Sequence, residues 1–171
     1  MHKAAKSSAA QKTGREPKAS RPRMQGYGVP KSLKGALPWK WARQRLSQSH
    51  NYLVISVRPN GGPHAMPVWG VWLDNAFYFS TSATSRKARN LRENPQCVVC
   101  TDKTDEVVIV EGVAQTLEDK DIPQRAFLDY KAKYKWELDP KMGAVIVVRP
   151  RVVFAMPEKL FPKGVTRWQF A

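Results

Sequence analysis

The feature that most constrains this chain is a strand, a short turn and a helix within residues 76–94, AFYFSTSATSRKARNLREN. In the first part, Phe77 and Phe79 fall on one face and Tyr78 on the other. This alternation, with its aromatic enrichment, predicts a strand. Residues 86–92 are then expected to form a helix, which ends at the proline that follows because proline cannot continue it.

The turn between the two elements is rich in hydroxyl groups, and Thr84 or Ser85 can cap the helix. The first helical turn carries two cations, Arg86 and Lys87, which oppose the helix dipole at a cost of about 0.3–1 kcal/mol each. A phosphate group at the helix N-terminus would reverse that cost, because N–H groups, hydroxyls and cations would converge on it. The alternative is an ordinary capped helix with solvated basic side chains. Composition alone leaves both possibilities open.

Four segments resemble the pyridoxamine-phosphate-oxidase-like flavin-binding split barrels. Phe79-Ser80-Thr81-Ser82 and Ser85-Arg86-Lys87 resemble that family's phosphate-binding segment, residues 62–72 (GPHAMPVWGVW) its second strand, and residues 166–170 (TRWQF) its closing strand. The similarity covers about residues 37–171 and is greatest to the subgroup that uses either FMN or a deazaflavin coenzyme. The resemblance implies a mainly β fold, a six-stranded antiparallel split β-barrel of Greek-key type with flanking helices.

The resemblance also implies which residues bind the cofactor. The turn and first helical turn would hold the phosphate, the end of the strand the ribityl chain, and backbone groups of the neighbouring strand the ring edge. The closing strand would contribute from the same chain or from a partner subunit; its alternative roles are a core tryptophan and a surface arginine. The residues are Ser85, Arg86 and Lys87 for the phosphate, Thr81 and Ser82 for the ribityl chain, Pro67, Val68 and Trp69 for the ring, and Arg167 and Trp168 from the closing strand.

One position departs from the family pattern. Met66 stands where the oxidase itself has a phosphate-binding arginine on the second strand. This difference argues against oxidation of vitamin B6 as the activity of this chain.

The sequence assigns no catalytic residue and no metal ligand. Of the three histidines, His2 lies in the N-terminal region and His50 at a helix–strand junction. His64 lies in a strand near the expected site, either as a proton donor or haem ligand, or simply facing solvent or a neighbour. No carboxylate pair or metal-spaced cluster is evident, which is typical of a protein whose cofactor supplies the chemistry.

The favoured function is an FMN-dependent oxidoreductase that transfers hydride between the flavin and a small organic substrate. The alternatives are a reductase that uses the deazaflavin coenzyme F420, and a non-catalytic protein that binds flavin or haem. A homodimer is expected because Val107–Val110 and Val145–Val148 are apolar on consecutive positions, so both sheet faces need cover. The expected helices can cover only part of that surface.

Charge is unevenly distributed along the chain. The net charge is +15, and residues 1–34 hold nine basic side chains against Glu16 alone. This composition predicts a disordered basic tail over residues 1–34 and a folded domain over residues 35–171. The tail is either an electrostatic arm or a solubilising leader; no aromatic residue precedes Tyr27 and no base-reading fold follows, so no specific nucleic acid is expected.

No apolar leader core or run of about 20 apolar residues is present in the sequence. The expected location is therefore the cytoplasm, without membrane attachment. Cys97 and Cys100 form a CxxC pair, but strand residues three apart point to opposite faces, so neither a disulfide nor a shared metal is expected.

The remaining segments predict a meander of strands joined by short turns. Gly112 suggests a bulge or a close backbone approach. Trp41 lies off the apolar stripe of the first helix, where it either lines a pocket or has no such role. The expected strands are 51–58, 63–72, 96–101, 106–117, 144–148 and 152–156 (split at Arg149-Pro150-Arg151) and 166–170, and the other expected helices are 39–46 and 119–136.

Overall fold

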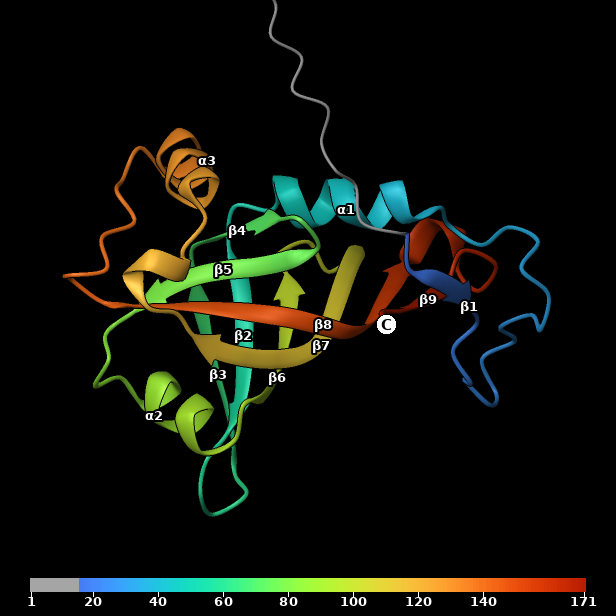
Figure 1. The fold of residues 1–171 in the computed structure, drawn as a ribbon. Coiled ribbons are helices and arrows are strands. Elements are labelled where there is room, and N and C mark those ends of the chain that lie inside the picture. The colour runs from blue at the N-terminus through green and yellow to red at the C-terminus, as the bar shows by residue number, and fades with distance from the viewer. Residues whose placement is uncertain (1–15) are drawn as a thin grey trace, which may run out of the picture.

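Nine strands pair into one antiparallel sheet in the computed structural model, which describes residues 16–171 (Figure 1). The hydrogen-bonded order is β1-β9-β8-β7-β6-β2-β3, with β5 joining β4 to β8. The strands are β1 Lys18–Ser20, β2 Tyr52–Val57, β3 Pro63–Val68, β4 Gly70–Leu73, β5 Ala76–Thr81, β6 Gln96–Thr101, β7 Glu106–Thr116, β8 Ala144–Pro157 and β9 Thr166–Gln169. The helices are α1 Trp39–Gln48, α2 Arg86–Glu93 and α3 Gln124–Tyr134, with 3-10 turns at Asp119–Asp121 and Glu158–Leu160. The mainly β split barrel with flanking helices is confirmed, with nine strands rather than six.

Strand β8 is continuous across Pro150, where the sequence predicted a break. Its first half pairs with β5 and its second half with β9, so the strand changes partners at its middle. The register against β7 shifts between Glu111 and Gly112, and Gly112 lies opposite Pro150. A Cβ on Gly112 would lie 2.5 Å from the Arg149 carbonyl oxygen. The bulge expected at this glycine is confirmed, and it accommodates a proline that has no N–H to donate.

The expected strand 63–72 is divided at Trp69 into β3 and β4. Strand β4 returns as β5 through a two-residue turn in which Asp74 and Asn75 both have positive φ, 49° and 59°. Such values define a type I′ hairpin turn, for which Asn and Asp are favoured residues. Strand β3 pairs only with β2 and is therefore a sheet edge.

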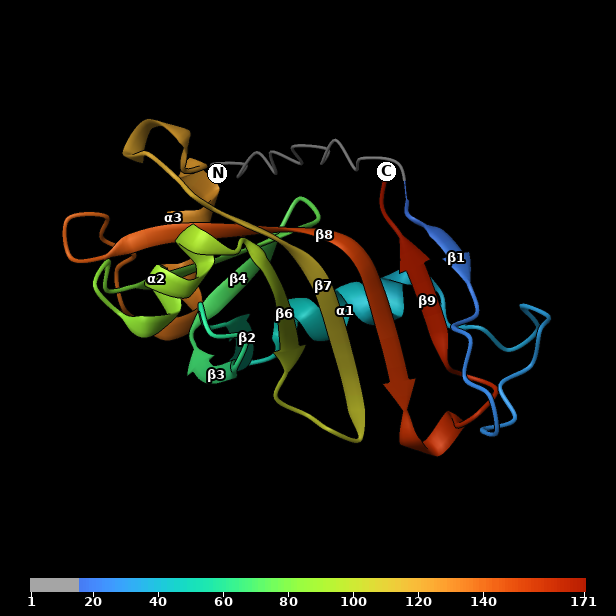
Figure 2. The ribbon, with the colours of Figure 1, turned by 90° about the horizontal axis from the view of Figure 1, so that it is seen from below.

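The helices lie on different faces of the barrel (Figures 1 and 2). Leu46 of α1 and Leu91 of α2 belong to the interior core together with Phe77, Val108 and Trp168. Helix α3 instead covers the outer face of β4, β5 and the first half of β8, where its side chains form a second apolar cluster. The helix expected over 119–136 begins later, because Pro123 separates the 3-10 turn from α3.

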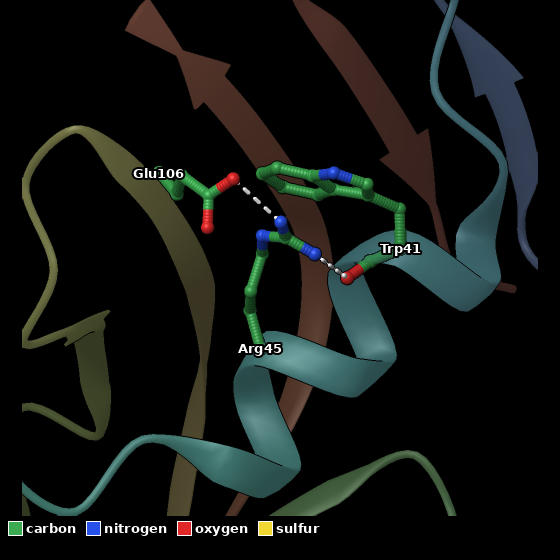
Figure 3. Close-up of polar contacts among 3 residues, drawn as sticks. All are labelled: Trp41, Arg45 and Glu106. Carbon is green, nitrogen blue, oxygen red and sulfur yellow. Dashed lines mark hydrogen bonds and ion pairs between the residues drawn. The ribbon is translucent and has the colours of Figure 1, made fainter.

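Helix α1 is tied to β7 through one arginine (Figure 3). The Arg45 guanidinium lies 3.5 Å from the centroid of the Trp41 ring and donates to Glu106 Oε1 at 2.6 Å. Trp41 therefore forms a cation–π contact, which explains its position off the apolar stripe of the helix. No pocket-lining role is needed for it.

The structure differs from the expectation of disorder over residues 16–34. Strand β1 pairs with β9, and the Arg21 guanidinium donates to the carbonyl oxygens of Ser32, Lys34, Lys163 and Val165. The folded domain therefore starts before residue 35. Residues 1–15, the rest of the expected tail, lie outside the described residues.

Cys97 and Cys100 are free thiols on alternate faces of β6, as the strand pattern predicted. Burial raises the pKa of both thiols, that of Cys97 to about 12, so neither is a reactive thiolate near neutral pH. Within residues 16–171, no helix combines the length and the apolar character needed to cross a membrane.

Candidate functional site

The turn between β5 and α2 is fixed by its own hydroxyl groups. Ser85 is the helix cap, and its Oγ accepts from the Ala88 N–H at 3.1 Å. The same Oγ lies 3.1 Å from Thr81 Oγ1 at the end of β5, and Arg92 Nη2 donates to the Ala83 carbonyl at 3.1 Å. A helix start leaves its first N–H groups without intrahelical partners, so those of Arg86 and Lys87 remain available.

Lys87 is buried, with 8% of its surface exposed, whereas Arg86 beside it is exposed. Burial lowers the pKa of Lys87, and no described side chain forms an ion pair or hydrogen bond with its ammonium group. The ammonium group lies over the Phe79 ring, with Nζ 5.8 Å from the ring centroid, at the distance limit of a cation–π contact. Nζ is not among the fully buried polar atoms, so the ammonium group keeps contact with solvent while the rest of the side chain is buried, and it is available to bind an anion.

Strand β3 brings His64 to the same site. His64 pairs with Ser56 of β2, and directly paired residues of an antiparallel sheet point to the same face. Ser56 Oγ accepts from Asn90 Nδ2 of α2 at 3.1 Å, so this face is the one that α2 covers. Burial and the positive charges of Arg58, Lys87 and Arg86, in that order, lower the pKa of His64. The site is therefore cationic throughout.

The sequence did not reveal Arg58 as a member of this cluster. The residue follows the end of β2, and its N–H donates to the Gly62 carbonyl in the β2–β3 turn. It lies two residues beyond Ser56, which places it on the α2 side of the strand. The only signal in the sequence was the alternation of side chains along the strand, which is informative only once the strand pairing is known.

The predicted ring-edge segment lies at the end of the β3 edge strand, where β3 breaks into β4. Pro67 and Trp69 are exposed and Val68 is buried between them. The Trp69 ring stacks on Tyr134 of α3, with centroids 5.0 Å apart and planes 9° apart. Backbone groups of an edge strand that pair with no further strand can bind a planar ligand.

The closing strand does not reach the α2 turn within one chain. Trp168 is fully buried in the barrel core, 5.4 Å from Trp39 between ring centroids, and is thus a core tryptophan. Arg167 Nε donates to Ser20 Oγ of β1 at 2.9 Å. Strand β9 and helix α2 lie on opposite sides of the molecule in both views (Figures 1 and 2). The contribution of Arg167 and Trp168 to the site of a partner subunit stays a prediction.

A second lysine, which is half-buried, occupies a different position at the end of α3. Lys133 Nζ donates to Tyr52 Oη at 2.8 Å and to the Gly70 carbonyl at 3.1 Å. Tyr134 Oη accepts from the Gly70 N–H at 2.9 Å and lies 2.8 Å from the carbonyl oxygens of Gly70 and His50. Burial lowers the pKa of Lys133 to about 8 and raises that of Tyr134 to about 12.

Lys133 also lines a cavity of about 1280 Å³ between α1, the β4–β5 turn and α3. Trp39, Trp72, Arg43 and Arg125 form other parts of its wall. This cavity lies away from the α2 turn, on the side of the barrel that carries α1 (Figure 1). It could not be foreseen from the sequence, because its walls come from segments far apart in the chain.

Among residues 16–171, no three His, Cys, Asp or Glu side chains are placed to hold a metal ion. The described part of the site offers cations, hydroxyls and free N–H groups. This donor set suits a phosphate ester rather than a metal.

Residues 40–156 match the family model described as pyridoxamine 5'-phosphate oxidase. This match spans more than half of the 171 residues, so the chain belongs to the pyridoxamine 5'-phosphate oxidase-like split-barrel family. The resemblance found in the sequence is thereby confirmed. Among curated proteins, none matches the chain significantly.

Several solved structures share the fold. An F420 reductase is 22% identical with a TM-score of 0.54, over 65% of this chain and 94% of that chain. A putative pyridoxamine 5'-phosphate oxidase from Listeria innocua is 21% identical with a TM-score of 0.55, over 66% and 93%. HutZ, a haem storage protein from Vibrio cholerae, is 18% identical with a TM-score of 0.56, over 68% and 91%. At these identities the likeness shows the fold alone.

Proposed function

We propose that this chain is an FMN-dependent oxidoreductase that anchors the flavin phosphate at the β5–α2 turn and acts on a small organic substrate. The observation that carries the proposal is the largely buried side chain of Lys87 at a capped helix N-terminus, whose ammonium group is open to solvent and has no protein partner among the described residues. Membership of the pyridoxamine 5'-phosphate oxidase-like family supports the same assignment.

The chain's own residues have distinct roles in this proposal. Lys87 and Arg86 would neutralise the phosphate, and the N–H groups at the start of α2 would bind its oxygens. The hydroxyls of Thr81 and Ser82 would hold the ribityl chain. Bound FMN supplies hydride-transfer chemistry, which no side chain of the described site can supply by itself.

The ring is assigned to the backbone of Pro67, Val68 and Trp69. Pro67 and Trp69 are exposed and the segment ends an edge strand, so it can accept a planar group without rearranging the core. The deazaflavin coenzyme F420 carries a phosphate in its tail and could use the same anchor, and the F420 reductase among the structural relatives supports it as the alternative.

We also propose that the active form is a homodimer. Directly paired residues Leu53, Cys100, Ile109 and Phe154 form an apolar row across β2, β6, β7 and β8. Their neighbours in each strand point into the barrel core, so this row faces outward. Leu53 is 40% exposed and the others are half-buried. The helices pack elsewhere, which leaves this face for a second copy of the chain.

The visible spectrum of the purified protein tests the cofactor assignment, together with mass spectrometry of whatever is released on denaturation. Released FMN supports the proposal, and released F420 supports the alternative coenzyme. A haem spectrum, or a protein that takes up neither flavin when each is added, would remove the oxidoreductase assignment. Light scattering tests the dimer: the mass of a single 19.4 kDa chain at micromolar concentration would exclude it.

A further inference from the structure

We infer that His64 is a proton-dependent ligand of the cofactor phosphate, taking the place of the arginine that this chain lacks at Met66. The inference rests on the proposed function and deepens it. It names a residue outside the anchor on β5 and α2, and it makes cofactor binding sensitive to pH.

The geometry places His64 where the missing cation would act. His64 and Met66 are two residues apart on β3, so both point to the same face of the strand. Through the pairing of His64 with Ser56, and the hydrogen bond from Asn90 to Ser56, that face is the one covered by α2. Met66 has no charge to offer a phosphate, whereas the imidazole can carry one.

Neither nitrogen of the His64 imidazole forms a hydrogen bond with the described residues. Its Nδ1 is buried without a hydrogen bond, and Nε2, which also has none, is not buried in this way. The ring is half-buried, so Nε2 is the atom open to a ligand. A side chain held on the site face without a protein partner is suited to bind a ligand atom.

The charges around His64 determine when it can bind an anion. The facing groups are Arg58 after β2 and Arg86 and Lys87 on α2, all cationic, and together with burial they lower the pKa of His64 in the free protein. A bound phosphate adds negative charge and raises that pKa again, so binding is accompanied by proton uptake. This contribution to affinity is complete below the free-state pKa and is lost as the pH rises through the bound-state pKa.

The test compares FMN, riboflavin and F420 binding to wild type and to His64→Gln between about pH 5.5 and about pH 8.5. The ratio of the two affinities for FMN isolates His64, because the ionisation of the FMN phosphate is common to both proteins. We expect wild type to bind FMN about ten-fold more tightly than the variant at the acid end, with the ratio falling toward one at the alkaline end. Riboflavin, which lacks the phosphate, should show a ratio near one throughout.

The F420 arm separates the two phosphate sources. If the affinity ratio depends on pH with FMN but not with F420, the ligand of His64 is the phosphate monoester of FMN. If it depends on pH with F420 but not with FMN, the ligand is the phosphate diester of F420. A ratio that is constant with pH, or an equal loss for riboflavin, overturns the role of His64 while the proposed function stands. Wild type that binds none of the three compounds overturns both.

A second measurement uses the wild-type protein, so it does not depend on the variant folding. The imidazole resonances of three histidines, His2, His50 and His64, are few enough to titrate by NMR, with His64→Gln for assignment. The pKa of His64 should rise when the phosphate-bearing cofactor is added and stay unchanged with riboflavin. An unchanged pKa in the loaded protein overturns the inference.

Discussion

Lys87 on α2 is buried and Lys133 on α3 is half-buried, and the surroundings of their ammonium groups are opposite. Burial lowers the pKa of each. Lys133 donates to Tyr52 Oη and the Gly70 carbonyl, whereas Lys87 has no hydrogen-bond or ion-pair partner among the described residues. One ammonium group is satisfied by the fold, and the other is not.

Under the proposed function, this difference separates a structural lysine from a ligand-binding one. Burial of a charged side chain costs free energy, and an ammonium group without a protein partner is free to bind an external anion. Lys133 stabilises the junction of α3 with β2 and β4 without any ligand. Lys87 has no such protein partner in the described part of the chain, so a bound anion would stabilise it, which makes it the more informative of the two about function.

The largest expected effect follows from exchanging each lysine for methionine. Lys87→Met should weaken FMN binding by about 1.5–3 kcal/mol, or ten- to a hundred-fold, because a charged hydrogen bond to the phosphate is lost. The free energy of unfolding without flavin should stay the same or increase, because methionine avoids the cost of partly desolvating a charged group at this largely buried position. Flavin titration and chemical denaturation measure the two quantities.

Lys133→Met is the matched control for that variant. It removes the same charge from a half-buried position on another helix, away from the α2 turn, so FMN affinity should remain within about three-fold of wild type while stability falls. Equal losses of FMN affinity in both variants would end the distinction between the two lysines. Unchanged affinity in Lys87→Met would remove the phosphate site from the α2 turn.

A somewhat smaller effect should follow from removing a hydroxyl group from the hydrogen-bonded junction of Lys133 and Tyr134 with Gly70. Tyr134→Phe removes the acceptor of the buried Gly70 N–H and should cost about 1–3 kcal/mol of stability. Tyr130→Phe is the control, since Tyr130 lies one helical turn earlier, is similarly buried and its hydroxyl makes no hydrogen bond with the described residues. In urea denaturation, Tyr130→Phe should have a free energy of unfolding close to that of wild type, and Tyr134→Phe a lower one. A cost of similar size in both would mean that apolar packing, and not the hydrogen bond, holds this junction.

Much of the fold could be predicted from local patterns. The alternation of Phe77 and Phe79, the Asp74-Asn75 turn and the serine cap at the start of α2 each act over a few residues, and the structure confirms them. The break expected near Pro150 was wrong because the bulge that accommodates this proline lies at Gly112, far away in the sequence. Long-range pairing decided the outcome at that point.

The same limit applies to the site. The turn from Thr81 to Lys87 is contiguous, so its residues could be assigned from the sequence. Arg58 and the orientation of His64 depend on strand register, and Arg167 forms its hydrogen bond with Ser20 of a strand that was expected to be disordered. Nothing in the sequence indicated the role of Lys133, because a lysine on a helix surface is usually solvated. Only the packing of α3 on β4 partly removes it from water.

The smallest expected effect is the pH dependence of the contribution that Lys133 makes to stability. The pKa of Lys133 is about 8 in the folded protein and near 10.5 in the unfolded chain, so the unfolded chain binds more protons between these values. The contribution of Lys133 to the free energy of unfolding therefore rises with pH above about 8, by at most about 1.4 kcal/mol per pH unit. The tyrosines and thiols whose pKa is raised act in the opposite direction, but they are common to wild type and Lys133→Met. The difference in stability between the two proteins, measured by urea denaturation at about pH 7 and about pH 9, isolates the lysine. It should favour wild type more strongly at the higher pH, and a difference that stays constant or shrinks would show that Lys133 keeps an ordinary pKa despite its burial.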